Sequence, residues 1–303
     1  MGGDGAPDIV VEGMEVAAER HPAARFLLVG DEPRLQALLA RHKRAAAACT
    51  IRHSTEVIDG DLKPTKALRL RGASMRIAID AVAAGEAAGV VSAGNSGALL
   101  ALAQIVIKTL PGIDRPAMAA VGPSARGDVV MLDLGANILC DSRNLVEFAV
   151  MGDVFARTVL GLTSPSIGLL NVGSEELKGD ESIRHAAEVL KASHLAGQYH
   201  GFVEGHDITA GTTDVIVTDG FTGNVALKTG EGALKLMGQM LRRVFTASIA
   251  ARIGYLLVRP GLERLREWLD PRRYNGAVML GLGGVVVKSH GGTDAQGFAH
   301  AVD

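Results

Sequence analysis

One arrangement of residues, repeated four times, constrains the fold of this chain more than any other feature. Each copy is an apolar run typical of a β-strand, a loop of small or polar residues, and an amphipathic pattern typical of a helix. The apolar runs span residues 88–93, 129–134, 166–172 and 214–219, and helices are predicted over 181–192 and from about 225 to 244. Near-continuous apolar strands that alternate with helices favour a parallel sheet covered on both faces. We therefore predict an α/β fold with a doubly wound, mainly parallel sheet and helices on both faces.

The loops after these strands form the expected ligand site. Right-handed crossovers place strand-to-helix loops at the carboxyl end of the sheet, where open α/β folds bind ligands. The loop Gly94, Asn95, Ser96 and Gly97 precedes a helix, so its backbone N–H groups suit an anion such as phosphate. The alternative is that such glycines only allow tight turns and close helix packing.

A short set of polar side chains occupies the other loops: Asp133, Asn137, Glu175, Glu176, Lys178, Asp219, Thr222 and Asn224. Lys178 is the one cation among them. A lysine flanked by carboxylates is most often a solvated surface charge, yet this one lies where a substrate is expected.

Several common chemistries lack their sequence marks. No dinucleotide or nucleoside triphosphate loop follows a strand, Ser96 is not in a nucleophile elbow, and the nine histidines form no metal-binding pair on one helix face. A formal net charge of -2 indicates no nucleic-acid partner. The two cysteines, Cys49 and Cys140, lack metal or redox spacing. We expect no cofactor, no metal and a cytoplasmic protein without a leader or membrane span.

A basic segment at 242–273 carries eight arginines against three carboxylates. Its apolar residues recur at helical spacing on both sides of Arg-Pro-Gly at 259–261, which is typical of a turn. The segment therefore predicts a protruding helical hairpin whose tip exposes Tyr255, Leu256, Leu257 and Val258 between arginines. That composition suits contact with an anionic membrane. The alternative is that the apolar stripe packs against a second subunit.

The order of the motifs along the chain resembles the bacterial phosphate acyltransferase family PlsX. The matching segments are "MGGDGAP" (1–7), "KPTKALR" (63–69), "SMRIAIDAV" (74–82), "SAGNSGALL" (92–100), "LDLGAN" (132–137), "FAVMG" (148–152), "NVGSEELKG" (171–179), "GFVEGHDI" (201–208), "DGFTGNVALKTGEG" (219–232) and "VVKSHGGTDAQGFAHA" (286–301). The resemblance implies one α/β domain over 1–303, with the hairpin as an insertion at about 242–273.

The resemblance also implies a reaction and partners. A long-chain acyl group would pass from an acyl carrier protein thioester to inorganic phosphate, giving an acyl phosphate for membrane phospholipid synthesis. Members of the family are homodimers and peripheral membrane proteins, so we expect a cytoplasmic homodimer at the inner face of the cell membrane. The arginines of the hairpin could instead attract the acidic carrier protein.

By resemblance, Lys178 and Asn224 are assigned to the reacting centre, where Lys178 would neutralise charge and Asn224 would donate a hydrogen bond. Gly94, Asn95, Ser96 and Gly97 are assigned to phosphate, with Asn137 and Thr222 as further candidates. Asp4, Lys288 and His290 are candidates to line the cleft, or have structural roles. Leu256, Leu257 and Val258 are assigned to the membrane tip.

Two departures and three rival functions remain open. Family members usually have a short strand before Met-Gly-Gly-Asp and a longer last helix, so we expect a sheet strand to be missing and the loop at 1–7 to be affected. The rivals are a phosphotransacylase that uses acyl-coenzyme A, a nicotinamide-linked decarboxylating dehydrogenase, and a non-catalytic membrane-associated scaffold.

Overall fold

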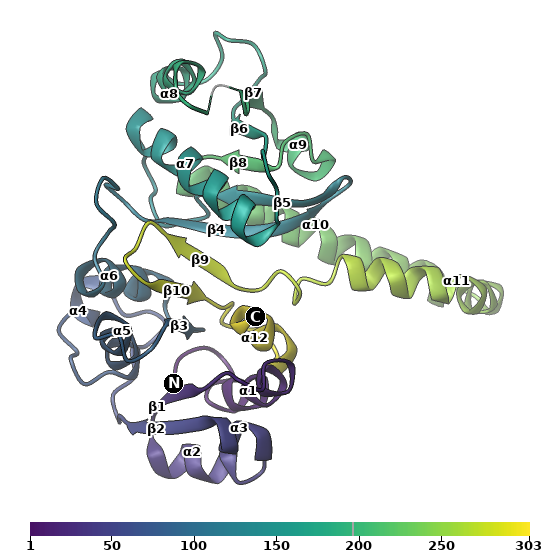
Figure 1. The fold of residues 1–303 in the computed structure, drawn as a ribbon. Helices are drawn as coiled ribbons and strands as arrows, with labels where there is room; N and C mark the ends of the chain where they lie inside the picture. The colour runs from purple at the N-terminus through teal and green to yellow at the C-terminus, as the bar shows by residue number, and fades with distance from the viewer. Residues whose placement is uncertain (196) are drawn as a thin grey trace. The chain divides into compact units, whose positions relative to one another are not determined.

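The computed structural model describes residues 1–195 and 197–303, which form two compact units (Figure 1). Unit 1 comprises Met1–Val121 and Pro271–Asp303, and unit 2 comprises Gly122–Asp270. The resemblance implies one domain over 1–303, which stays a prediction. Strand β4 (Ala117–Ser124) runs across the boundary between them.

The main sheet of unit 1 combines parallel and antiparallel pairs. Its strands lie in the order β3 (Gly89–Ser92), β10 (Val285–Lys288), β9 (Ala277–Leu280) and β4. β3 pairs with β10 in parallel, with Val90 opposite Val286, while β9 is antiparallel to both β10 and β4. A second, two-stranded parallel sheet joins β1 (Phe26–Gly30) and β2 (Cys49–His53).

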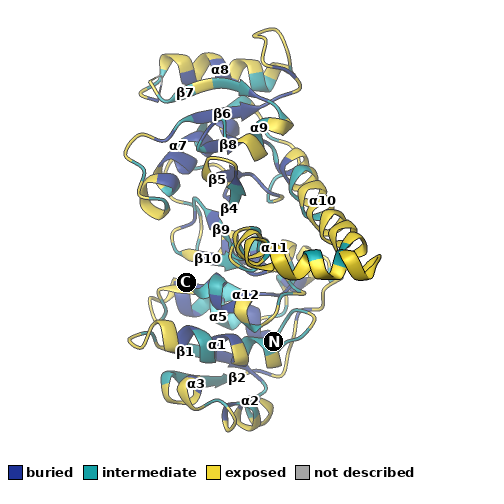
Figure 2. Cartoon of the chain, turned by 90° about the vertical axis from the view of Figure 1, so that its right-hand side faces the viewer, coloured by how far each residue is buried: buried dark blue, intermediate teal, exposed yellow. Residues whose placement is uncertain are grey.

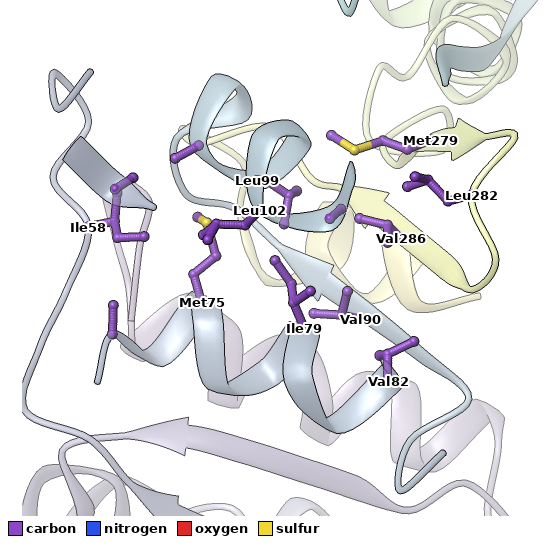
Figure 3. Packing of buried hydrophobic residues seen from close by; sticks show 14 residues of the cluster. Ile58, Met75, Ile79, Val82, Val90, Leu99, Leu102, Met279, Leu282 and Val286 are labelled. Carbon is purple, nitrogen blue, oxygen red and sulfur yellow. The ribbon is translucent and has the colours of Figure 1, made fainter. Parts of the chain in front are cut away.

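Seven helices are described in unit 1: α1 (Asp8–Arg20), α2 (Glu32–Leu39), α3 (Lys43–Ala48), α4 (Pro64–Ala67), α5 (Ser74–Ala83), α6 (Ser96–Val106) and α12 (Ala295–Val302). The core of this unit lies between α5, α6 and the main sheet. Figure 3 shows Ile79 of α5 and Leu99 of α6 near Val90 of β3. Burying each such side chain contributes about 1.5–3 kcal/mol, so this cluster fixes the helix that follows β3.

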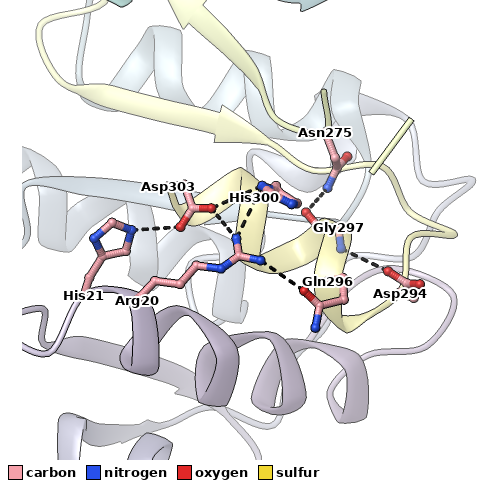
Figure 4. Close-up of polar contacts among 8 residues, drawn as sticks. All are labelled: Arg20, His21, Asn275, Asp294, Gln296, Gly297, His300 and Asp303. Atoms are coloured by element: carbon pink, nitrogen blue, oxygen red, sulfur yellow. Dashed lines mark hydrogen bonds and ion pairs between the residues drawn. The ribbon is translucent and has the colours of Figure 1, made fainter. Parts of the chain in front are cut away.

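Helices α1 and α12 pack closely because Gly13 leaves room for Phe298. A Cβ at Gly13 would lie 2.9 Å from the Phe298 side chain. Polar contacts hold the ends of the same two helices together (Figure 4): Arg20 Nη2 donates to Gln296 Oε1 at 3.0 Å, and both Arg20 and His21 contact the Asp303 carboxylate.

The sheet of unit 2 is parallel over β5 (Gly127–Leu132), β8 (Val215–Val217), β6 (Ile167–Leu170) and β7 (Tyr199–Val203), in that order. Every residue of β6 and β8 is buried, as expected for strands covered on both faces. The helices α7 (Ser142–Val159), α8 (Glu181–Ala192) and α9 (Gly205–Ala210) connect these strands. The predicted helix over 181–192 and the α/β fold with a mainly parallel sheet flanked by helices are confirmed.

A long helical hairpin ends unit 2. It consists of α10 (Gly220–Thr246) and α11 (Ile249–Trp268), and Figure 2 shows that both are largely exposed. The predicted turn at 259–261 is wrong, because α11 continues through Pro260. The turn lies at Ala247 and Ser248, where the Ser248 hydroxyl accepts a hydrogen bond from the Ala251 N–H and caps α11.

The three residues assigned to a membrane tip therefore lie within α11, and their contact with a membrane stays a prediction. Leu256, Leu257 and Val258 are all exposed, and Leu257 is 80% exposed. Across the described residues, every helix is too short or too polar to cross a bilayer.

Candidate active site

The strand ends of unit 2 bring three loops to one edge of its sheet. Val217 of β8 lies opposite Leu132 of β5 on one side and opposite Leu169 of β6 on the other, so the three parallel strands end level with one another. The loops that leave these strands carry most of the predicted polar residues. This is the carboxyl edge, where open α/β sheets bind ligands.

The loop after β5 is organised around Asp133, whose side chain is fully buried. Its Oδ1 accepts hydrogen bonds from the N–H groups of Gly135 and Ala136, at 3.1 and 3.0 Å. Its Oδ2 accepts from the backbone N–H and the side-chain amide of Asn137, at 2.7 and 2.9 Å. The carboxylate therefore supplies the hydrogen-bond acceptors for backbone N–H groups of a loop that lies outside the strands and helices.

The start of α10 packs tightly on this loop, and only glycine fits there. A Cβ at Gly223 would lie 2.0 Å from the Asp133 carbonyl oxygen, and a Cβ at Gly220 would lie 2.6 Å from the Asn137 carbonyl oxygen. The Gly220 N–H donates to that same Asn137 oxygen at 2.7 Å. This approach places Asn224 against the β5 loop, since a Cβ at Gly135 would be 3.7 Å from the Asn224 Cβ.

Asp219 caps α10 and engages Thr222. Its Oδ1 accepts from the Thr222 N–H at 2.9 Å, and its Oδ2 accepts from the Thr222 hydroxyl at 2.6 Å. The candidate phosphate residue Thr222 therefore directs its hydroxyl proton to Asp219. Asn224, one turn into the helix, is exposed.

Lys178 lies on the loop after β6 and is exposed. Asn171 shapes this loop, because its side-chain amide donates to the Lys178 carbonyl oxygen at 3.1 Å. Gly179 adopts a φ of +85°, and a Cβ there would lie 2.3 Å from Asn171 Oδ1. The Asn171 hydrogen bond and the left-handed backbone at Gly179 thus fix the backbone from which the Lys178 side chain projects.

The carboxylate of Glu176 is directed to another cation. Lys191 of α8 donates to Glu176 Oε1 at 2.6 Å, and this hydrogen bond lowers the pKa of Glu176 below its usual value. The sequence placed Lys178 between two carboxylates; the structure pairs one of them with Lys191.

The predicted phosphate loop at 94–97 belongs to unit 1. Asn95 caps α6, since its Oδ1 accepts from the Ala98 N–H at 2.9 Å. Its amide nitrogen donates to carbonyl oxygens of the preceding loop, at 2.7 Å to Gly60 and 3.1 Å to Leu62. Both ends of the Asn95 amide are therefore occupied by the protein, whereas Ser96 and Gly97 are exposed at the first turn of the helix.

The cleft candidates Asp4 and His290 lie close to one another in unit 1. The Asp4 N–H donates to the Gly291 carbonyl oxygen at 3.0 Å, and the Gly292 N–H donates to His290 Nδ1 at 3.2 Å. A Cβ at Gly2 would lie 2.9 Å from the Gly94 Cα, so the loop at 1–7 also touches the phosphate loop. The third candidate, Lys288, donates to the Ser289 carbonyl oxygen.

Two features of the edge were missed from the sequence. Asn171 was not singled out, although an Asn directly after a buried strand is a frequent loop-shaping residue. A pocket of about 400 Å³ at the ends of β6 and β8 was also missed, because its walls come from residues far apart in the chain, including Ile138, Leu169 and Phe221.

Comparison with known proteins gives one consistent family. A family model described as "Fatty acid synthesis protein" matches residues 1–303. The chain is 75% identical over 303 residues to a phosphate acyltransferase of Granulibacter bethesdensis, covering all of this chain and 82% of that protein. It is 71% identical over 303 residues to a phosphate acyltransferase of Acidiphilium cryptum, covering all of this chain and 80% of that protein.

Solved structures of similar fold are more distant in sequence. A phosphotransacetylase from Streptococcus pyogenes matches with a TM-score of 0.65 at 17% identity, over 98% of this chain and 89% of that one. A branched-chain phosphotransacylase from Enterococcus faecalis V583 matches with a TM-score of 0.57 at 15% identity, over 99% and 94% of the two chains. At these identities the likeness shows the fold.

Proposed function

The chain belongs to the fatty acid synthesis protein family and is an enzyme of the phosphate acyltransferase class, and we propose that it moves a long-chain acyl group from acyl carrier protein to inorganic phosphate. The observation that carries this proposal is that the parallel strands β5, β8 and β6 of unit 2 end side by side at one edge of the sheet. There the loop after β6 carries Lys178, and the start of α10, which follows the paired strand β8, carries Asn224; both residues are exposed.

The proposed step needs no strong base. An oxygen of hydrogen phosphate attacks the thioester carbonyl carbon, a C–O bond forms, and the C–S bond breaks. The electron pair leaves with sulfur, and the proton released by phosphate is taken up by the thiolate. The products are an acyl phosphate and the free carrier thiol, and the enzyme contributes mainly position and charge.

Lys178 and Asn224 are proposed as the catalytic residues. The Lys178 ammonium would neutralise charge on phosphate or on the developing oxyanion, and the Asn224 amide would donate a hydrogen bond to one of them. The tight packing of Gly223 on the Asp133 loop supports a fixed position for Asn224.

Phosphate contacts are proposed both for the loop at 94–97 of unit 1 and for Asn137 and Thr222 of unit 2. In unit 1, the exposed first turn of α6 at Ser96 and Gly97, with Gly94 and Asn95 before it, suits an anion. Asp4, Lys288 and His290, also of unit 1, are proposed to line the substrate cleft. In unit 2, Thr222 and Asn137 are the candidates, and their side chains hydrogen-bond to Asp219 and Asp133.

The test is phosphate-dependent release of carrier thiol from palmitoyl acyl carrier protein. We expect Lys178→Ala and Asn224→Ala each to lower kcat by about 100-fold or more, as for loss of a donor to an oxyanion. Lys228→Ala is the matched control, because this exposed lysine of α10 pairs with Glu231 at 2.9 Å. Release that survives in both variants would keep the reaction and reject this site.

The donor is tested by the same assay with palmitoyl-coenzyme A in place of the carrier protein thioester. A higher kcat/KM with the carrier protein is expected. Preference for coenzyme A would favour the phosphotransacylase alternative.

The hairpin is proposed to form the interface of a homodimer and to contact a membrane surface. The membrane contact would hold the enzyme at the inner face of the cell membrane. In its favour are exposed apolar residues on both helices, such as Met237 and Ile253, beside the arginines. Analytical sedimentation tests whether the protein is a dimer. Flotation with anionic vesicles tests the membrane contact, and Leu256→Ser and Leu257→Ser are expected to weaken it. Flotation without any phosphate-dependent thiol release would instead favour the scaffold alternative.

A further inference from the structure

The pocket at the carboxyl edge of unit 2 is mostly apolar. Its volume is about 400 Å³, within the range of small-molecule sites. Leu169, Leu170 and Val217, at the ends of β6 and β8, line its buried side. Ile138 and Leu139, from the loop after β5, line it closer to solvent.

Three large apolar side chains of the pocket lining are highly exposed to solvent. Ile138 is 68% exposed, Leu139 is 82% exposed and Phe221 is 63% exposed. Three such residues around one opening form a surface that an apolar ligand would remove from water.

The polar groups of the pocket gather at two helix starts. The carboxylate of Asp180 accepts from the Ile183 N–H at 2.9 Å, and that of Asp219 accepts from the Thr222 N–H at 2.9 Å. These two carboxylates are thus used as caps for α8 and α10. The proposed catalytic residues are close by in the chain, with Lys178 two positions before Asp180 and Asn224 two positions after Thr222.

We infer that this pocket binds the acyl chain of the substrate, with the thioester end towards Thr222 and the methylene chain along Leu139, Phe221 and Leu169. This inference rests on the proposed function, since it assumes an acyl donor. A methylene chain has no polar groups to satisfy, so it suits these walls. The phosphopantetheine arm of a carrier would bring amide groups that need hydrogen-bond partners, and the side chains of Leu139, Phe221 and Leu169 offer none.

The first experiment compares donors that differ only in chain length. kcat/KM is measured with acyl carrier protein thioesters of 4, 8 and 16 carbons. Leu139→Asp places a charge at the opening without disturbing the core, and it should lower the ratio of 16-carbon to 4-carbon kcat/KM by about tenfold or more. Val154→Asp is the matched control, because Val154 of α7 is exposed and is not part of the pocket wall; it should leave the ratio unchanged.

The second experiment does not depend on turnover. Cys140 lines the pocket, and Cys49 is the other cysteine of the chain, so a Cys49→Ser background leaves Cys140 as the one thiol to alkylate. Hexadecanoate should slow alkylation of Cys140, octanoate should slow it less, and acetate should leave it unchanged. Leu139→Asp should abolish the protection, and Val154→Asp should retain it.

The outcomes separate the two proposals. If no donor gives phosphate-dependent thiol release, the proposed function fails, and the alkylation rates still decide whether the pocket binds an acyl chain. If release occurs but Leu139→Asp changes every chain length equally, or if hexadecanoate gives no protection, the acyl-chain pocket is rejected while the reaction stands.

Discussion

The Asp133 carboxylate holds Asn137 twice, once through the backbone N–H at 2.7 Å and once through the side-chain amide at 2.9 Å. Asp133 is fully buried, so these bonds form away from water and the loop depends on them. The pair connects the end of β5 to the start of α10, because the Asn137 carbonyl oxygen also accepts from the Gly220 N–H.

Asn137→Ala should therefore act first on stability. Loss of a hydrogen bond to a charged group costs about 1.5–3 kcal/mol, and urea unfolding followed by circular dichroism measures it. Asn137→Asp should be worse than alanine, because it places a second carboxylate beside Asp133. A large rise in the KM for phosphate with unchanged stability would contradict this and support direct contact between Asn137 and phosphate.

Gly223→Ala should disrupt the site severely, since the new Cβ would lie 2.0 Å from a backbone oxygen that cannot move independently. We expect loss of thiol release and a lower unfolding midpoint. Gly230→Ala in the same helix is the control: no atom lies within 4 Å of its added Cβ, and the higher helix propensity of alanine should stabilise the protein by about 0.5–1 kcal/mol. Equal effects of the two substitutions would show that the close approach at Gly223 is unimportant.

Asn95 should prove to have two separable functions. Asn95→Ser keeps an acceptor for the Ala98 N–H but loses the donor to Gly60 and Leu62, whereas Asn95→Ala loses both. Because a helix cap contributes about 1 kcal/mol, the serine variant should be more stable than the alanine variant by that amount. Identical unfolding curves for the two would mean that the cap contributes nothing.

Asp207 should make the protein sensitive to acid. Hydrogen bonds from the Thr212 hydroxyl and the Glu204 N–H lower the pKa of Asp207 below its usual value of 3.8. A carboxyl group with a lowered folded-state pKa stabilises the protein above pH 3.8, and that stabilisation is lost as the pH falls through the lower, folded-state pKa.

The measurement is the unfolding midpoint between pH 6 and pH 2 in the parent and in Asp207→Asn, at roughly the same ionic strength throughout. The parent should lose more stability over the acidic part of this range than the variant. Glu188→Gln is a suitable control, because Glu188 is an exposed residue of α8. Parallel pH profiles for the parent and Asp207→Asn would overturn the assignment.

The parts of this molecule that sequence predicts are those governed by local patterns. The buried strands around Val130, Leu169 and Ile216 form continuous apolar runs, and the helix over 181–192 has a strong amphipathic pattern, so both were found. Strand pairing such as Val90 with Val286 joins residues almost two hundred positions apart, and no local pattern specifies it.

The hairpin shows how a local signal is overridden. Proline removes one backbone hydrogen bond from a helix, which made a turn at 259–261 the natural prediction. The helical spacing of the apolar residues continues on both sides of Pro260, and α11 runs from Ile249 to Trp268 with the Arg259–Glu263 ion pair at 2.7 Å spanning the proline. The turn between α10 and α11 lies at Ala247 and Ser248, and the sequence did indicate it, because serine is a residue type that favours helix starts.

The positions of the candidate residues could be predicted in part for a similar reason, and their roles stay predictions. Loop positions follow from strand ends, so the sequence placed Lys178 and Asn224 after β6 and β8. The partners of each polar group do not follow from loop position: nothing in the sequence alone assigns Glu176 to Lys191 or the Thr222 hydroxyl to Asp219.

The order of the chain through the two units has a consequence for synthesis on the ribosome. Unit 1 is built from two stretches of chain, and unit 2 lies between them in sequence. Strand β3 pairs with β10, and β4 pairs with β9, so the main sheet of unit 1 lacks its central strands until β9 and β10 have been made. The nascent chain can complete unit 2 while β3 still lacks its partner β10, which leaves the apolar residues around Val90 open to chaperones or aggregation during translation.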